Sequence, residues 1–240
     1  QAEVRFSKAQ TGGAHPEVDT AALLGLARSY ISGNRPQRAI ETIDRYVERY
    51  PAGSSLSDAY FLQAEAFMQQ GDWSRAVQTY EQYAQINPGL IDSYLWERTG
   101  DAHLANANYP AAAEAFDLAL ASDRSGNLNF LLLDKAQALG LAGDLSQAVA
   151  LYDLVSSKTK YDTTRAQMDY LRGQIATQLG EPESASLYFQ HATENYPTAY
   201  YSYLSLVELV TAGIKVNELQ RGLIDFHAAQ YLPAIQAFDH

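Results

Sequence analysis

Small and bulky positions alternate along this chain with a period of 36 or 37 residues. The intervals between successive alanines at Ala39, Ala76, Ala112, Ala148 and Ala185 are 37, 36, 36 and 37 residues, and Ala234 follows after 49. Twelve residues before each alanine stands a small residue: Ala27, Ala64, Gly100, Ala136, Gly173 and Gly222. Four residues after each stands a bulky one: Ile43, Tyr80, Phe116, Tyr152, Phe189 and Phe238. A fixed period of this length predicts one helical unit stacked on copies of itself.

Each period predicts two antiparallel helices joined by a short turn. Two helices approach closely where both carry small side chains at the crossing, and a bulky side chain one turn later fills the groove beside it. The residues between the two helices are Asn34, Gly71, Ala107, Gly143, Gly180 and Ala229, and glycine there suits a left-handed helix end. Pro51, Pro88 and Pro197 close three units, since proline cannot continue a helix. The prediction is an all-α, right-handed superhelix of about six helical hairpins.

The repeat register also predicts where the domain and its repeat units begin and end. Residues 1–18 form a polar lead-in, and a repeat domain occupies 19–240. Its units are expected near 20–53, 57–90, 93–126, 129–162 and 166–197, with a truncated unit over 215–240. The residues from Tyr196 to Leu204 open an added helix over 198–212, outside the repeat phase, with Thr198 as its N-cap.

The order of aromatic, small, aromatic, alanine and proline positions resembles the tetratricopeptide repeat (TPR) family, whose unit has about 34 residues. The match is clearest in the third unit, at Trp96, Gly100, Tyr109, Ala112 and Phe116, and in the second, at Phe67, Gly71, Trp73, Ala76, Tyr80 and Pro88. It covers residues 20–240. The resemblance implies a solenoid that binds a protein or peptide in a concave groove lined by the first helix of each unit.

The family positions that face the groove imply a partner-binding surface at Asp58, Phe61, Glu65, Met68, Tyr94, Glu97, Asp101, Phe130, Gln137, Tyr170 and Gln174. Its centre is expected to be acidic and aromatic, and its later part rich in amides. Grouped carboxylates attract cationic ligands, and aromatic faces bind a cation or an apolar sugar face, so a basic or glycan-like partner is favoured. The alternative is a solvated groove whose aromatic residues pack against the next unit.

One family mode of binding is disfavoured. Some members clamp a C-terminal carboxylate with lysine and asparagine, but the corresponding positions here are Leu24, Phe61, Glu97, Leu133 and Tyr170. An adaptor for chaperone tails is therefore not expected.

A second resemblance covers the added helix and the last unit. Residues 196–204 and 221–235 are similar to the superhelix that precedes the catalytic domain of bacterial soluble lytic murein transglycosylases. That family carries its catalytic glutamate in a Glu-Ser motif followed by Gly-Leu-Met-Gln. The one Glu-Ser here, Glu183-Ser184, has no such segment after it and suits the first turn of a helix, where the dipole favours acid. The resemblance implies a non-catalytic part of an enzyme whose catalytic domain lies beyond His240.

Composition narrows the function further. A net charge of −11 disfavours nucleic acid, because such binding depends on basic side chains that displace counterions. No stretch of about 20 apolar residues predicts a membrane span. There is no cysteine, and the HExxH, GxSxG, phosphate-loop and GxGxxG motifs are absent. The five histidines, His15, His103, His191, His227 and His240, are predicted to be surface or packing residues. No catalytic, cofactor or metal site is expected in this chain.

Three functions remain open. The leading one is a TPR interaction scaffold. The second is the substrate-positioning superhelix of a peptidoglycan lytic enzyme, and the third is a bacterial envelope assembly factor, because Ala39–Pro51 and Ala76–Pro88 also resemble outer-membrane assembly lipoproteins. The transglycosylase-like resemblance implies an extracytoplasmic location, and otherwise a cytoplasmic one is expected. A lysozyme-like domain after His240, or a lipidated cysteine before Gln1, would separate the last two. Oligomeric state and partner identity do not follow from the sequence.

Overall fold

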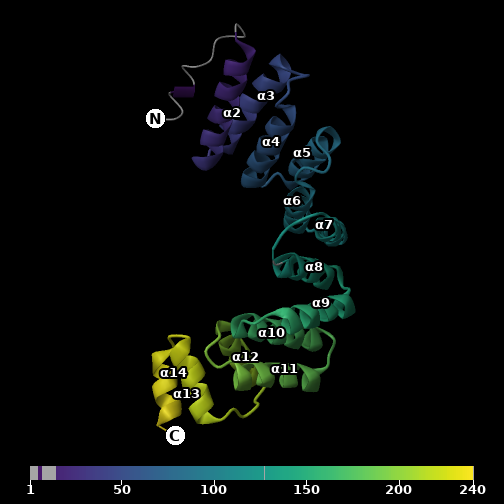
Figure 1. The fold of residues 1–240 in the computed structure, drawn as a ribbon. Coiled ribbons are helices and arrows are strands. Elements are labelled where there is room, and N and C mark those ends of the chain that lie inside the picture. Colours follow the sequence, from purple (N-terminus) through teal and green to yellow (C-terminus); the bar gives the residue numbers. More distant parts are fainter. Residues whose placement is uncertain (1–4, 7–14, 127, 240) are drawn as a thin grey trace. The chain divides into compact units, whose positions relative to one another are not determined.

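The computed structural model describes residues 5–6, 15–126 and 128–239. Within these ranges the chain forms helices and no strand, so the predicted all-α fold is confirmed (Figure 1). Most of the polar lead-in expected over 1–18 lies outside the described residues, and the first long helix already begins at Pro16. No helix in the described part has the length and apolar character needed to cross a membrane.

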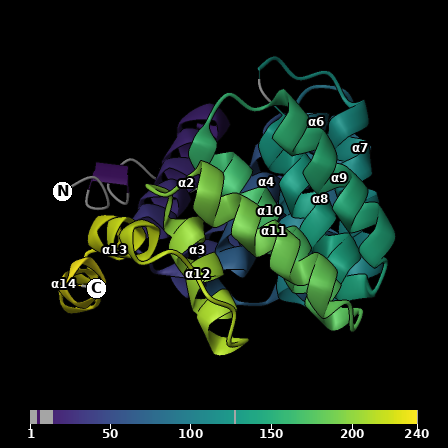
Figure 2. The same ribbon diagram turned by 90° about the horizontal axis from the view of Figure 1, so that it is seen from below.

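Two compact bodies make up the chain. The N-terminal body (Gln1–Gly126) holds three hairpins: α2 (Pro16–Ser32) with α3 (Pro36–Arg49), α4 (Leu56–Gln70) with α5 (Trp73–Ile86), and α6 (Asp92–Ala105) with α7 (Tyr109–Ala121). The C-terminal body (Asn127–His240) holds α8 (Asn129–Ala142), α9 (Leu145–Lys158), α10 (Asp162–Gln178), α11 (Pro182–Asn195), α12 (Tyr200–Thr211), α13 (Glu218–His227) and α14 (Tyr231–Phe238). The paired helices of the last hairpin, α13 and α14, lie side by side in both views (Figures 1 and 2).

The helix crossings follow the predicted register. Ala27, Ala64, Ala112 and Ala148 have no exposed surface. A Cβ added at Gly100 would stand 2.6 Å from Cε1 of the fully buried Phe116 ring, which is closer than atoms in a relaxed contact. The bulky position of the second helix therefore fills the space that the small position of the first helix leaves.

The turns between paired helices are left-handed, as the register predicts. The residues Asn34, Gly71, Ala107, Gly143, Gly180 and Ala229 all have positive φ, between 52° and 92°. At α4, the amide of Asp72 donates to the carbonyl of Phe67 and the amide of Gly71 to that of Met68, so the free carbonyls at the helix end are bonded. Asp72 then caps α5 by accepting a hydrogen bond from the amide of Arg75.

The added helix expected near 198–212 is α12, but its predicted N-cap is wrong. The helix begins at Tyr200, so that Ala199 holds the N-cap position and makes no side-chain cap. The buried hydroxyl of Ser202 donates instead to the carbonyls of Ala192 and Tyr196, 2.9 and 2.7 Å away. These bonds tie the start of α12 to the end of α11 and place the first helical residue two positions after Thr198.

Candidate partner-binding surfaces

In the N-terminal body, Glu65 is held by the two neighbouring helices. Arg98 on α6 places Nε 2.8 Å from Oε1 of Glu65 and Nη2 2.8 Å from Oε2, a bidentate ion pair. The buried hydroxyl of Tyr80 on α5 donates to the same Oε1. The hydrogen bonds that Arg98 donates to Glu65 raise the pKa of Arg98, while burial first and then the charge of Glu65 raise the pKa of Tyr80. Both carboxylate oxygens of Glu65 are thus bonded to side chains of this same chain.

The other carboxylates of the expected acidic centre also have arginine partners. Arg98 lies 3.3 Å from Asp101, and burial raises the pKa of Asp101 more than this ion pair lowers it. Glu97 pairs with Arg124, whose guanidinium stands 3.8 Å from the centre of the Tyr94 ring. At the exposed edge, Asp58 lies 4.0 Å from Arg28.

Arginines, which were not among the predicted groove residues, therefore offset most of the negative charge of these four carboxylates. Four carboxylates, at Asp58, Glu65, Glu97 and Asp101, share the three arginines Arg28, Arg98 and Arg124. Arg98 immediately follows Glu97 in the sequence, but nothing local shows that it reaches a residue 33 positions earlier.

Two of the expected aromatic and apolar groove residues serve packing. The Phe61 ring lies 6.0 Å from the rings of both Tyr80 and Tyr83, and Met68 packs against the same buried cluster. Both tyrosines lie on α5, the hairpin partner of α4, so the Phe61 ring packs on rings of its own unit, whereas the alternative expected aromatic residues to pack against the next unit.

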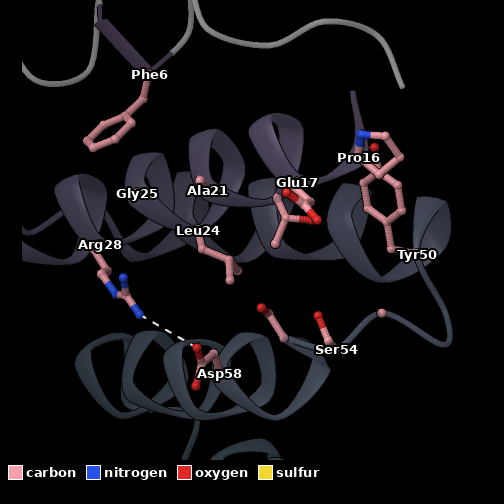
Figure 3. Close-up of a pocket in the computed structure, with 13 residues that line it drawn as sticks. Phe6, Pro16, Glu17, Ala21, Leu24, Gly25, Arg28, Tyr50, Ser54 and Asp58 are labelled. Atoms are coloured by element: carbon pink, nitrogen blue, oxygen red, sulfur yellow. Dashed lines mark ion pairs between the residues drawn. The ribbon is translucent and has the colours of Figure 1, made fainter. Parts of the chain in front are cut away.

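A pocket of about 590 Å³ lies beside the first hairpin (Figure 3). Ala21 and Leu24 line it from α2, Arg28 and Asp58 pair at one end, and Glu17 and Tyr50 stand toward the other. Phe6 lies over Gly25 at its upper side. Asp58 is the predicted site residue that lines this pocket.

The C-terminal body carries a second pocket, of about 370 Å³, that we call the amide pocket. It is lined by Phe130, Leu133, Asp134 and Gln137 of α8, Tyr152 of α9, Gln167 and Leu171 of α10, and Tyr201 of α12. Two of the predicted site residues, Phe130 and Gln137, thus contribute directly to one cavity. Leu133, Leu171 and Tyr152 give it an apolar wall, while Gln137 and Gln167 bring side-chain amides to the same space.

The remaining predicted residues, Tyr170 and Gln174, stand next to this pocket. The Gln174 amide donates to the Tyr170 hydroxyl over 2.6 Å, and the Tyr170 ring packs 5.7 Å from the ring of Tyr201. Burial, and secondarily the charge of Glu208, raises the pKa of Tyr170. Tyr170 and Gln174 thus support the side of the amide pocket that Tyr201 lines.

The histidines take no common site. Within the described residues, no group of three or more histidine, aspartate or glutamate side chains is placed so that it could hold a metal ion. Burial lowers the pKa of His103, as expected of a packing residue. His191 on α11 has a carboxylate partner on the preceding helix, α10, because its Nδ1 lies 2.7 Å from the buried Asp169, which Arg172 also contacts at 2.7 Å. His227 packs on Phe226, and His240 lies outside the described residues.

Glu183 stands in the first turn of α11, the place expected for it. Within the described part of the chain, no ion pair or hydrogen bond holds its side chain in a cleft.

Models of the tetratricopeptide repeat match residues 9–54, 24–91 and 166–198. The chain contains tetratricopeptide repeats. These matches cover parts of both bodies, and the hairpins between them keep the same small and bulky positions at their helix crossings.

Solved TPR structures share the fold. YrrB, described as a TPR protein with an unusual peptide-binding site, is 18% identical with a TM-score of 0.64, over 86% of this chain and 100% of its own. The C-terminal part of a TPR repeat-containing protein from Cytophaga hutchinsonii is 15% identical with a TM-score of 0.63, over 99% and 86%. PilF of Pseudomonas aeruginosa is 19% identical with a TM-score of 0.55, over 86% and 88%. At these identities the likeness concerns the fold alone.

No curated protein matches the chain. The resemblances to transglycosylase superhelices and to envelope assembly lipoproteins stay predictions, since none of the TPR matches described here tests them.

Proposed function

We propose that this chain is a non-catalytic TPR scaffold that binds an extended peptide segment of a partner protein in the amide pocket. The observation that carries the proposal is the convergence of an apolar wall and two glutamine amides, from α8 and α10, on one cavity of about 370 Å³. Cavities of this size, mostly apolar with a few convergent polar groups, are typical ligand sites.

Peptide chemistry suits this lining. A glutamine amide both donates and accepts, so Gln137 and Gln167 can pair with the N–H and C=O groups of an extended backbone. Leu133 and Leu171 offer apolar surface to one inserted side chain, and Phe130, which is 38% exposed, can cover it. The peptide-binding site ascribed to YrrB, a structural relative, supports the same class of ligand.

The charge distribution argues against a cation as the ligand of the N-terminal body. The groove carboxylates Glu65, Glu97 and Asp101 already have arginine partners, so a basic ligand in the groove would have to break existing ion pairs before it gained new ones. No contact among the described residues favours a glycan over a peptide, so glycan binding is one outcome that the experiment must separate.

The experiment is selection of peptides from a displayed random library on the full chain, followed by calorimetry with the purified peptides. Phe130→Ala and Gln137→Ala should each weaken binding about tenfold, which corresponds to about 1.4 kcal/mol. Gln178→Ala, at an exposed amide of α10 that does not line the pocket, is the matched control and should bind as the parent does.

Two results would contradict the proposal. One is that the selected peptides bind equally well to the Phe130→Ala and Gln137→Ala variants. The other is that peptidoglycan-derived oligosaccharides bind in a Phe130-dependent manner while no peptide does.

A further inference from the structure

The added helix α12 leaves a separate cavity on the C-terminal body, which we call the α11–α12 pocket. Helix α12 has 12 residues, whereas the first helix of the preceding hairpin, α10, has 17. After its C-cap at Ala212 the chain turns at Gly213, where φ is 74°. The last turn of α12 therefore ends beside the first half of α11, and a space of about 520 Å³ remains between them.

The floor of this pocket is apolar. Phe189 and Leu209 are 4% and 1% exposed, and Ile214 packs against the same cluster. The walls at Ala185 and Ala212 carry only methyl groups, which keeps the cavity open. An apolar side chain that entered would leave water and contribute about 25 cal/mol for each Å² of apolar surface removed from it.

The rim is acidic. Glu208 is the charged residue among those that line the pocket. Glu181 and Glu183 flank the lining residue Pro182 in the sequence, and Lys215 follows the lining residue Ile214. No ion pair to any of these three glutamates occurs among the described residues. The N-terminus of α11 offsets about half of one charge through the helix dipole and Lys215 offsets one more, so an excess of negative charge remains around the mouth. A cation near the mouth is therefore favoured and an anion disfavoured.

We propose that the α11–α12 pocket is a second peptide site, which takes an aromatic or aliphatic side chain flanked by lysine or arginine. The apolar floor selects the inserted side chain, and the rim glutamates select its basic neighbours. This pocket shares no lining residue with the amide pocket, so the two proposals can fail independently.

The test is a nuclear magnetic resonance titration of the full chain with three synthetic pentapeptides: Gly-Lys-Trp-Lys-Gly, Gly-Lys-Ala-Lys-Gly and Gly-Glu-Trp-Glu-Gly. The first should shift the amide resonances of Leu209 and Ala212 in a saturable way. The alanine and glutamate peptides should bind at least about tenfold more weakly, a difference of about 1.4 kcal/mol.

Two variants locate the binding. Ala212→Trp places a ring into the cavity from an exposed helix end, and Glu208→Lys reverses the charge of the rim; each should weaken binding of the Lys-Trp-Lys peptide about tenfold. Glu194→Lys, at an exposed carboxylate on α11 that does not line the pocket, makes the same charge change and should leave the affinity within about twofold of the parent, less than 0.5 kcal/mol. Unshifted melting temperatures establish that the variants fold.

The proposal is overturned if the Lys-Trp-Lys peptide produces no saturable shift at Leu209 and Ala212. It is also overturned if Gly-Glu-Trp-Glu-Gly binds as tightly, or if Glu194→Lys weakens binding as much as Glu208→Lys. Phe130→Ala, in the amide pocket, should leave the affinity for the Lys-Trp-Lys peptide unchanged. The tests of the two pockets can therefore be told apart.

Discussion

The repeat position that holds Glu65 and Asp101 in the N-terminal body holds Gln137 and Gln174 in the C-terminal body. In the first body the carboxylates of this position are paired with Arg98. In the second, Gln174 orients a tyrosine and Gln137 lines a cavity. One position of the same repeat thus forms ion pairs between helices in one body, and in the other it lines or adjoins the cavity that we propose as a peptide site.

This difference shows why net charge is a poor guide to the site. The chain carries a charge of −11, yet the carboxylates that the TPR register places in the groove are largely neutralised by arginine. Glu208 of the α11–α12 pocket, and Glu181 and Glu183 next to it in the chain segment around Pro182, have no such partner among the described residues. The charge available to a ligand depends on pairing across helices, which composition does not report.

The packing positions, unlike the surface positions, should behave alike in the two bodies. A Cβ at either Gly100 or Gly173 would come within 3.0 Å of a buried ring, that of Phe116 or of Phe189. Gly100→Ala and Gly173→Ala should therefore each cost about 3 kcal/mol of unfolding free energy, the upper end of the usual cost of overpacking. Chemical denaturation measures both.

Gly140→Ala is the matched control for this prediction. Its added Cβ would meet nothing nearer than the Cβ of Ala148 at 3.9 Å, an ordinary contact. Replacing glycine inside a helix should then stabilise the chain by about 0.5–1 kcal/mol. Equal stabilities of Gly100→Ala and Gly140→Ala would mean that the helix crossing is not close-packed.

The surface positions should differ between the bodies. Arg98→Met keeps most of the side-chain volume but leaves Glu65 and Asp101 without their cation, and should cost about 1–2 kcal/mol of stability. Gln137→Ala, at the corresponding surface of the C-terminal body, should change stability by less than about 0.5 kcal/mol. If the two substitutions have equal effects on the unfolding free energy, the contrast between paired and ligand-facing positions fails.

The smallest effect is expected from His103 in the N-terminal body. Burial lowers its pKa below 6.5, although the nearby charges of Glu81 and Glu114 act in the opposite direction. The unfolded chain then binds a proton more readily than the folded chain, so stability is lost as the pH falls below 6.5. Thermal melts at pH 7.5 and 5.5 should show a larger loss for the parent than for His103→Gln. The same loss in both would assign the pH dependence to other groups.

Much of the fold could be predicted because it depends on local repeats. The alanine register located the close helix crossing within the hairpins, and even the non-glycine turn residues Asn34, Ala107 and Ala229 adopt positive φ where the period required a turn. The predicted N-cap of α12 was wrong. The preference of Thr198 for an N-cap is local, whereas the hydroxyl of Ser202 forms hydrogen bonds to two carbonyls at the end of the preceding helix.

The candidate site was predictable only in part, because its chemistry depends on long-range pairing. Phe130 and Gln137 follow from the repeat register and meet in one cavity. The pairing of Glu65 with Arg98 and that of Asp169 with His191 join residues 33 and 22 positions apart, on different helices. No sequence spacing distinguishes such pairs from solvated charges.

The central claim is that a peptide partner binds the amide pocket of the C-terminal body. Hydrogen exchange of the full chain, with and without a peptide selected on it, tests this most directly, since bound segments open less often. We expect slowed exchange in α8 and α10, with α4 and α6 unchanged. Slowed exchange in α4 and α6, with α8 and α10 unaffected, would contradict the account.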